Sequence, residues 1–171
     1  MSDRARIADL RDAVAASLAA AWAPTLPDAV ESTWLARISF DENDEAELTV
    51  GRHLYVIAGG VSLAPLTRSH WKNGYTIGVV FVERYTDTDD PPDDWIDARV
   101  KWWERTVLYP LCAPSLTLAG PEGIVTDARP DPETPPEVTT FVDRELLTEC
   151  KAVLIACNFA FIDGTDHTGA A

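Results

Sequence analysis

Two neighbouring segments near the middle of the chain carry the clearest hydrophobic patterns. From Tyr75 to Tyr85 successive positions alternate, and β-branched and aromatic residues dominate, which predicts a strand near the centre of a sheet. From Trp95 to Leu111 apolar residues recur at spacings of three and four, which predicts an amphipathic helix. Because the two segments have comparable lengths, we expect the helix to lie along the sheet and cover it.

Weaker patterns predict the remaining elements. Residues 3–22 have the apolar spacing of a second amphipathic helix, rich in alanine and followed by a proline. Alternation predicts strands over 33–40 and over 48–58, the latter interrupted by a glycine. Residues 151–162 alternate between two apolar faces, as in a strand covered on both sides, although a helix that begins at 145–149 and continues into them is an alternative.

The segment between the second and third predicted strands is expected to be a loop. Gly59-Gly60 opens it, and the turn signature Asn73-Gly74 closes it. The loop contains a cluster of basic and aromatic residues that we select as a candidate protein interface: Arg68, His70, Trp71 and Lys72. Such a mixture also suits phosphate or single-stranded nucleic acid binding, and a solvated hairpin tip is the third interpretation.

A proline-rich segment over 114–136 separates the helix predicted from Trp95 to Leu111 from the last predicted strand. Six of the twelve prolines lie here. Leu116 and Leu118, or Ile124 and Val125, are expected to form short edge strands, or else the segment is irregular. Because such a segment more often serves contacts than chemistry, it is a candidate subunit interface, represented by Pro130, Pro132 and Pro135.

These elements predict one α+β domain over residues 1–162, with the proline-rich excursion inside it. Its expected core is a mostly antiparallel sheet of about four to five strands packed against two amphipathic helices. Residues 163–171 are small and polar, and we expect a flexible C-terminal tail.

Charge is unevenly distributed along the chain. The 171 residues carry a net charge of −14, and much of it lies in two loops, 41–47 and 86–94, that contain no basic residue. We predict that these acidic loops are solvated tips or surfaces that repel polyanions, and not nucleic acid grips. Asp93 and Asp94 are expected to cap the following helix. The other candidate acids are Asp41, Glu42, Asp44, Glu45, Asp87, Asp89 and Asp90.

Recognisable catalytic chemistry is missing from the sequence. Cys112, Cys150 and Cys157 match no metal spacing or redox motif, and we expect buried or half-buried thiols. No phosphate loop, nucleophile elbow or zinc-binding helix motif occurs. The prediction is a protein without catalytic residues, metal or other cofactors. The charged N-terminus and the lack of a long apolar run predict neither a signal peptide nor a membrane span.

The order of the parts resembles the tail terminator, or tail completion, proteins of long-tailed bacteriophages. The resemblance rests on the alanine-rich helix, the aromatic strand before an acidic turn, the strand Leu54-Tyr55-Val56-Ile57 followed by Gly59-Gly60, the loop Pro65-Leu66-Thr67-Arg68, the strand from Tyr75 to Val79, the acidic linker and the helix after it. It covers residues 3 to about 111, with the last predicted strand, 151–162, as a weaker match.

The resemblance implies a structural virion protein that forms a homo-oligomeric ring, a hexamer, at the head-proximal end of the tail tube. Such a ring ends tube polymerisation and contacts the tail tube protein and the neck or connector proteins. DNA passes through it without sequence-specific binding, and one acidic loop would face the lumen. The implied location is the virion, after assembly in the host cytoplasm. Two other hypotheses remain, a neck adaptor of the same particle and a small-ligand-binding domain.

Overall fold

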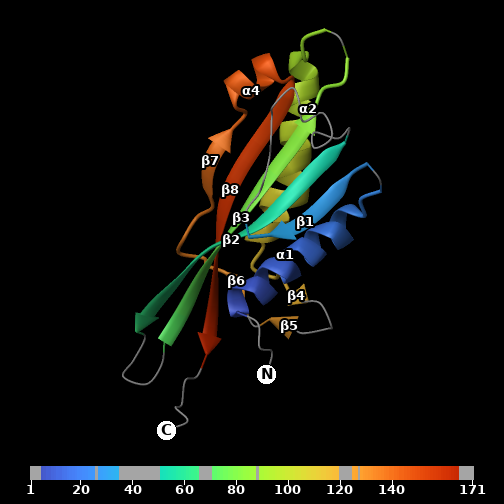
Figure 1. Cartoon of the computed structure of the whole chain (residues 1–171). Coiled ribbons are helices and arrows are strands. Elements are labelled where there is room, and N and C mark those ends of the chain that lie inside the picture. The colour runs from blue at the N-terminus through green and yellow to red at the C-terminus, as the bar shows by residue number, and fades with distance from the viewer. Residues whose placement is uncertain are drawn as a thin grey trace.

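The computed structural model of the chain describes residues 5–25, 27–34, 51–65, 71–87, 89–119, 125–126 and 128–165. It is an α+β structure, as the sequence predicts. Within the described residues six strands form one sheet, with β1 at one edge and β6 and β7 at the other (Figure 1). Only the pair β1–β2 is parallel, and every other pair is antiparallel.

The sheet is built around three long strands. They are β2 (Arg52–Pro65), β3 (Trp71–Arg84) and β8 (Ala152–Thr165). The alternating side chains of β3 and β8 explain why these two occupy the centre, since Ile77, Phe81 and Phe161 are fully buried. The edge strands are short: β1 (Ala29–Thr33), β6 (Arg129–Pro130) and β7 (Glu137–Phe141). A separate pair consists of β4 (Leu118–Ala119) and β5 (Val125–Thr126).

Two helical segments share one core with the sheet. The first is α1 (Arg6–Trp22). The second runs from α2 (Asp93–Trp103) through a π-helical turn, η1 (Glu104–Leu108), to α3 (Tyr109–Cys112). The buried stripe of α1 and the predicted stripe of the second helix join the inner side chains of β3 in a single cluster. A short helix, α4 (Arg144–Glu149), precedes β8.

The predicted loop between the second and third strands is wrong. β2 continues through Gly59 and Gly60 to Pro65, and β3 begins at Trp71, so Asn73-Gly74 lies inside a strand. A β-bulge between Ala58 and Gly60 absorbs the irregularity. The strands approach closely at two of the glycines: a Cβ on Gly59 would lie 3.1 Å from the Thr76 carbonyl oxygen, and a Cβ on Gly74 would collide with the Ser62 hydroxyl. Gly59 and Gly74 therefore allow close packing between the strands and do not mark a turn.

Other features also differ from the prediction. The strand expected over 33–40 lies outside the described residues from position 35 on, and the sequence did not predict β1, which ends at Thr33. β8 extends to Thr165, so residues 163–165 belong to the strand and not to a tail. The predicted side-chain caps of α2 are wrong, because Pro92 takes the N-cap position without a side-chain hydrogen bond. Asp93 and Asp94 lie in the first turn, where they still face the positive end of the helix dipole.

Candidate assembly surface

The outer edge of β2 is only half covered. β1 pairs with β2 from His53 to Ile57. Beyond that point, residues 58–65 have no strand partner on this side within the described part of the chain. In Figure 1 this half of β2 projects, together with the ends of β3 and β8, past the helices. An uncovered edge presents backbone N–H and C=O groups to a partner.

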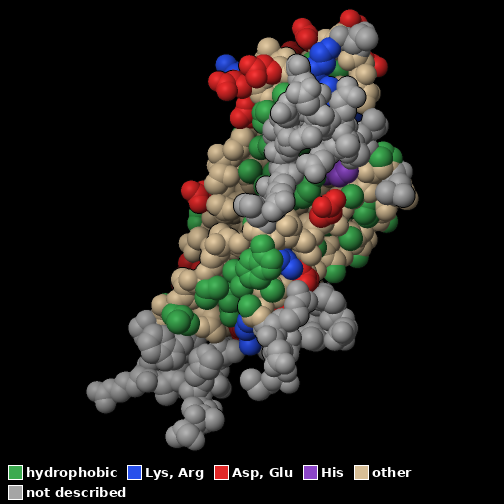
Figure 2. Space-filling model, viewed as in Figure 1, with side chains coloured by type: hydrophobic (Ala, Val, Ile, Leu, Met, Phe, Trp, Pro, Cys, Tyr) green, Lys and Arg blue, Asp and Glu red, His purple; other side chains and the backbone are tan. Residues whose placement is uncertain are grey.

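Apolar side chains accompany this uncovered edge. Val61 is 58% exposed and Leu63 is 63% exposed, while Tyr75, the cross-strand neighbour of Val61, is only 6% exposed. Directly paired residues point to the same face of a sheet, so Val61 shares the face of Tyr75, and Leu63, two residues later, lies on that face too. Further along the sheet, the helices cover this face. Figure 2 shows hydrophobic side chains gathered over this end of the sheet. Exposed apolar groups in one place favour an interaction surface.

The opposite edge of the sheet contains a hollow of about 410 Å³. Its floor includes Phe159 and Ala160 of β8, and the end of α3 contributes Leu111 and Cys112. The segment around β6 and the turn before β7 forms the rest of the wall. Five prolines line it: Pro114, Pro130, Pro132, Pro135 and Pro136. Proline side chains are rigid rings, and the hollow therefore has an apolar wall of fixed shape.

The rim of this hollow is held by Asp131. Its backbone N–H donates to the carbonyl oxygen of Ala160 at 2.9 Å. Its carboxylate accepts from the backbone N–H of Glu133 at 3.1 Å and from the hydroxyl of Thr134 at 3.0 Å, and Lys72 Nζ lies 3.5 Å away. Burial raises the pKa of Asp131, but these hydrogen bonds and the Lys72 charge outweigh it and lower the pKa below its ordinary value.

The three cysteines are thiols, as predicted. Burial, with smaller contributions from nearby groups, raises the pKa of Cys157 to about 11, so this thiol stays protonated at neutral pH. Burial also raises the pKa of Cys112, the half-buried thiol that lines the hollow. A raised pKa is the opposite of what a nucleophilic cysteine needs. Cys112, half-buried in the wall of the hollow, can still serve as a chemical reporter there at mildly alkaline pH, where more of the thiol is ionised.

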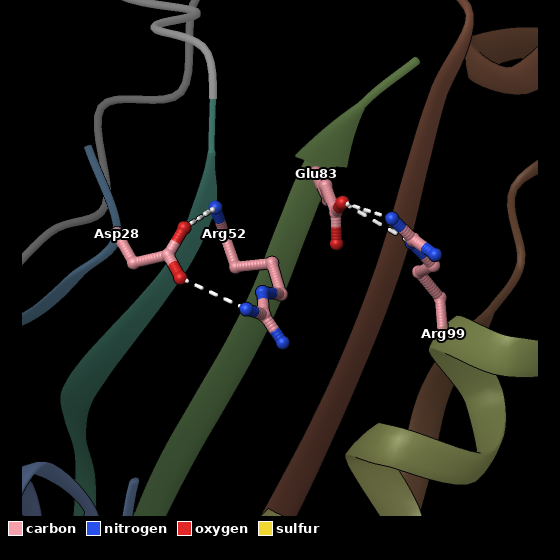
Figure 3. Close-up of polar contacts among 4 residues, drawn as sticks. All are labelled: Asp28, Arg52, Glu83 and Arg99. Atoms are coloured by element: carbon pink, nitrogen blue, oxygen red, sulfur yellow. Dashed lines mark hydrogen bonds and ion pairs between the residues drawn. The ribbon is translucent and has the colours of Figure 1, made fainter. Parts of the chain in front are cut away.

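Polar contacts hold the helices and the strands of the sheet in place (Figure 3). Asp28 accepts from the backbone N–H of Arg52 at 2.8 Å and from its Nη2 at 3.0 Å. The Arg52 guanidinium also lies over the rings of Trp22 and Trp102, at 5.3 Å and 5.1 Å. This cation–π contact joins α1, β2 and α2.

A second contact in Figure 3 joins α2 to β3, where Arg99 donates to Glu83. Arg99 Nη2 lies 2.7 Å from Glu83 Oε1, and Arg99 Nε lies 3.1 Å from the same oxygen. In the projecting part of the sheet, Arg6 of α1 forms an ion pair with Asp163 of β8, whose side chain is fully buried. Buried carboxylates are thus paired with arginines from the helices, which fixes helix positions on the sheet.

The structure brings together part of the predicted interface. Lys72 contacts Asp131 and Glu133 at 3.5 Å, and this contact places the start of β3 beside the proline-rich segment. Pro130, Pro132 and Pro135 all line the hollow. Trp71 is the first residue of β3 and not part of a loop, whereas Arg68 and His70 lie outside the described residues.

The acidic linker before α2 is exposed, as expected for a surface loop. Asp87, Asp89 and Asp90 are solvent-exposed. A hydrogen bond to Asp87 raises the pKa of the Tyr85 hydroxyl, and the Tyr85 ring lies 5.0 Å from that of Trp95. The linker is therefore attached to the start of the helix. The other candidate acids, Asp41, Glu42, Asp44 and Glu45, lie outside the described residues.

Sequence reasoning missed the functional interest of Val61 and Leu63 because the glycine pair before them indicated a loop. A signal was available, since Val61-Ser62-Leu63 continues the alternation of apolar and polar residues past Gly60. The sequence also did not indicate that Val138 and Phe141 of β7 would be exposed, at 44% and 57%. Their strand, five residues long and mostly exposed, shows no buried stripe to detect.

Other kinds of site receive little support from the described residues. No group of three His, Cys, Asp or Glu side chains is placed to hold a metal ion within these ranges. None of the described helices has the length and apolar character that crossing a bilayer requires. A scan of family models finds no match to the chain, and a search of curated proteins finds none either.

Proposed function

We propose that the protein is a ring-forming structural subunit of a long-tailed bacteriophage particle, of the tail terminator type. In this role, copies of the chain associate side by side, and the ring ends the tail tube and joins it to the neck. The fold agrees with the α+β protomer that the resemblance implies. The resemblance in sequence supports the assignment to a phage tail, and the exposed apolar side chains of β2 together with the hollow support association between copies.

One observation carries the proposal: the two opposite edges of the same sheet both expose apolar side chains. Val61 and Leu63 are exposed on β2, and the prolines and Phe159 that line the hollow lie at the far edge. The two surfaces differ in sequence, so contact between them is heterologous. A heterologous contact joins copies head to tail, and it produces a ring when the rotation between copies closes.

Measurement of the oligomeric state tests the assembly part of this proposal. We expect the purified protein to elute as a closed oligomer in size-exclusion chromatography with light scattering, with native mass spectrometry giving a single stoichiometry. Negative-stain images should show rings with a central opening. A protein that stays monomeric at concentrations well above micromolar would contradict the proposal.

The position in the particle needs a second assay. Tail tubes assembled in vitro from a tail tube protein should stop growing, and keep a defined length, when the ring is added. A neck adaptor would also form an oligomer but would leave tube length unchanged, so this assay separates the two virion hypotheses. The control is the same tube protein incubated with bovine serum albumin.

The hollow supports a second candidate function, the binding of a small apolar ligand. Its volume of about 410 Å³ and its lining by Phe159, Leu111 and several prolines fit the size and chemistry of a ligand pocket. This alternative predicts a stable monomer that binds a metabolite, which native mass spectrometry of freshly purified protein would detect as an added mass. A closed oligomer without added mass would favour the structural role.

A further inference from the structure

We propose that the proline-lined hollow of one copy receives the exposed apolar side chains of β2, Val61 and Leu63, from the next copy. The inference rests on the proposed ring function and names the contact that would build the ring. Both halves of the contact are present on every chain, at opposite edges of one sheet. The proposed occupant is therefore a second copy of this protein.

The register of the sheet places the two halves at the same height. Val61 pairs with Tyr75, Tyr75 pairs with Phe161, and Phe161 pairs with Pro130. This row of paired residues runs across the sheet from the uncovered edge of β2 to the wall of the hollow. A copy placed beside the first without a shift along the strands would bring its Val61 to the height of Pro130.

The two halves also lie on the same face of the sheet. Val61 shares its face with Tyr75 and Phe161 through direct pairing. Phe159, two residues before Phe161 in β8, lies on that face too and forms the floor of the hollow. A sheet that continues from copy to copy would therefore direct Val61 and Leu63 toward the face on which Phe159 lines the hollow.

Strand direction is consistent with such continuation. β2 is antiparallel to β3, β3 is antiparallel to β8, and β8 is antiparallel to β6. A neighbouring β2 in the same orientation would thus run antiparallel to β6 and extend the alternation. β1 covers β2 only from His53 to Ile57, so the half that reaches the height of the hollow is the half left uncovered.

The chemistry of the far edge favours side-chain insertion over a long backbone ladder. Pro130 has no N–H to donate, and proline on an edge strand limits strand addition. The hollow, in contrast, offers prolines and Phe159 beside that strand; Arg129 and Asp131 also line it, and Asp131 already faces Lys72 at 3.5 Å. Val61, Ser62, Leu63 and Ala64 carry no charge, so nothing on this segment would require a charged partner inside the hollow.

Cross-linking between copies tests the contact directly, with Cys112 as the reporter in the hollow. One copy carries Val61→Cys with Cys112→Ser, and the other keeps Cys112; both carry Cys150→Ser. A short bismaleimide should join the two only when they are mixed. The matched control places the cysteine on α2, as Asp97→Cys with Cys112→Ser, and should give at least about tenfold less cross-linked product. Cross-linking of the Val61→Cys copy to itself would indicate β2-to-β2 pairing and overturn the inference.

Charged substitutions supply the second test. Val61→Asp with Leu63→Asp should weaken the oligomer about 30-fold or more in dissociation constant, as expected for a central apolar contact. Both side chains are exposed in the isolated chain, so its circular dichroism should not change. Phe141→Asp, at an equally exposed position away from the hollow, is the control and should leave the dissociation constant within about threefold.

The outcomes separate this inference from the proposed function. An oligomer that persists in the double variant, or that dissociates equally in Phe141→Asp, would overturn the contact and leave the ring proposal standing. A wild-type protein that is monomeric and forms no cross-link would contradict both. An oligomer that cross-links through Cys112 and dissociates only in the double variant would support both.

Discussion

At the scale of single residues, arginines hold the buried carboxylates of the sheet. The Glu83 side chain is nearly buried, and only one of its oxygens is paired, with Arg99 of α2. Removal of one partner from such a pair leaves a buried charge without compensation, which costs more than the pair itself contributes. The loss of Arg99 should therefore be felt in folding stability.

We predict that Arg99→Ala lowers the free energy of unfolding by about 1–3 kcal/mol. The measurement is urea unfolding followed by tryptophan fluorescence, with wild type and variant at the same pH. The exposed part of the Arg99 side chain, which is 28% accessible, keeps the expected loss below that of a fully buried pair.

The control for this prediction is the double variant Glu83→Gln with Arg99→Ala. It leaves no charge buried, so it should recover a measurable part of the lost stability. If the double variant is as unstable as Arg99→Ala alone, then packing of the Arg99 side chain on Trp95, 4.5 Å from the ring centroid, and not the ion pair, accounts for the loss.

At the scale of elements, periodicity predicted the parts that build the core. The alternation in β3 and β8 and the stripe of α2 succeeded because burial selects apolar residues at those spacings. The projecting half of β2 was missed because Gly59-Gly60 and Asn73-Gly74 have the composition of turns. Only the pairing of β2 with β3 shows that these glycines lie inside strands, which come close at Gly59 and Gly74. That information is non-local and does not appear in a short window of sequence.

The candidate site was predictable to a smaller extent. Lys72 and the prolines of the excursion were selected as separate interface candidates, and the structure joins them through Asp131. Their proximity depends on β6 and on the turn after it, two residues of strand with one proline, which leave no periodic signal. The sequence could indicate which residues would be surface contacts, but only the folded sheet brings them to one edge.

The contribution of Asp131, in the turn at the rim of the hollow, to the free energy of unfolding should depend on pH. The folded pKa of Asp131 lies below its ordinary value of 3.8. Its contribution to stability is thus fully present above that value and is lost as the pH falls through the folded pKa. Wild type should be more stable than Asp131→Asn by a constant amount at neutral pH, and the difference should shrink in acid below the ordinary value.

Thermal unfolding of wild type and Asp131→Asn across a pH series would measure this difference. Glu133→Gln is the matched control, because Glu133 also faces Lys72 at 3.5 Å but its side chain is 81% exposed. Its stability difference from wild type should stay small throughout the series. A difference for Asp131→Asn that is independent of pH would assign the role of Asp131 to shape and not to charge.

At the scale of the whole molecule, the two ends differ in character. Figure 2 shows Asp and Glu side chains gathered at one end, away from the projecting strands, which carry hydrophobic side chains. Side-by-side association through the sheet edges would preserve this polarity, so every copy would present its acidic end on the same rim of the ring. A rim of like charge would repel the phosphates of DNA that passed through such a ring.

This polarity gives a prediction about DNA. Substitution of Asp87, Asp89 and Asp90 by lysine should leave fold and oligomeric state unchanged, because all three are exposed, the hydrogen bond lost between Asp87 and Tyr85 lies at the surface, and the linker's contact with Lys151 is made by the backbone oxygen of Asp89. The assembled variant should retain double-stranded DNA in a fluorescence anisotropy assay, with an affinity that falls as salt rises. The asparagine triple variant, which removes charge without reversing it, should bind DNA more weakly than the lysine variant. If the lysine variant assembles normally and still fails to bind DNA, the acidic end does not face the DNA path, and the residues 41–47 become the candidate for that surface.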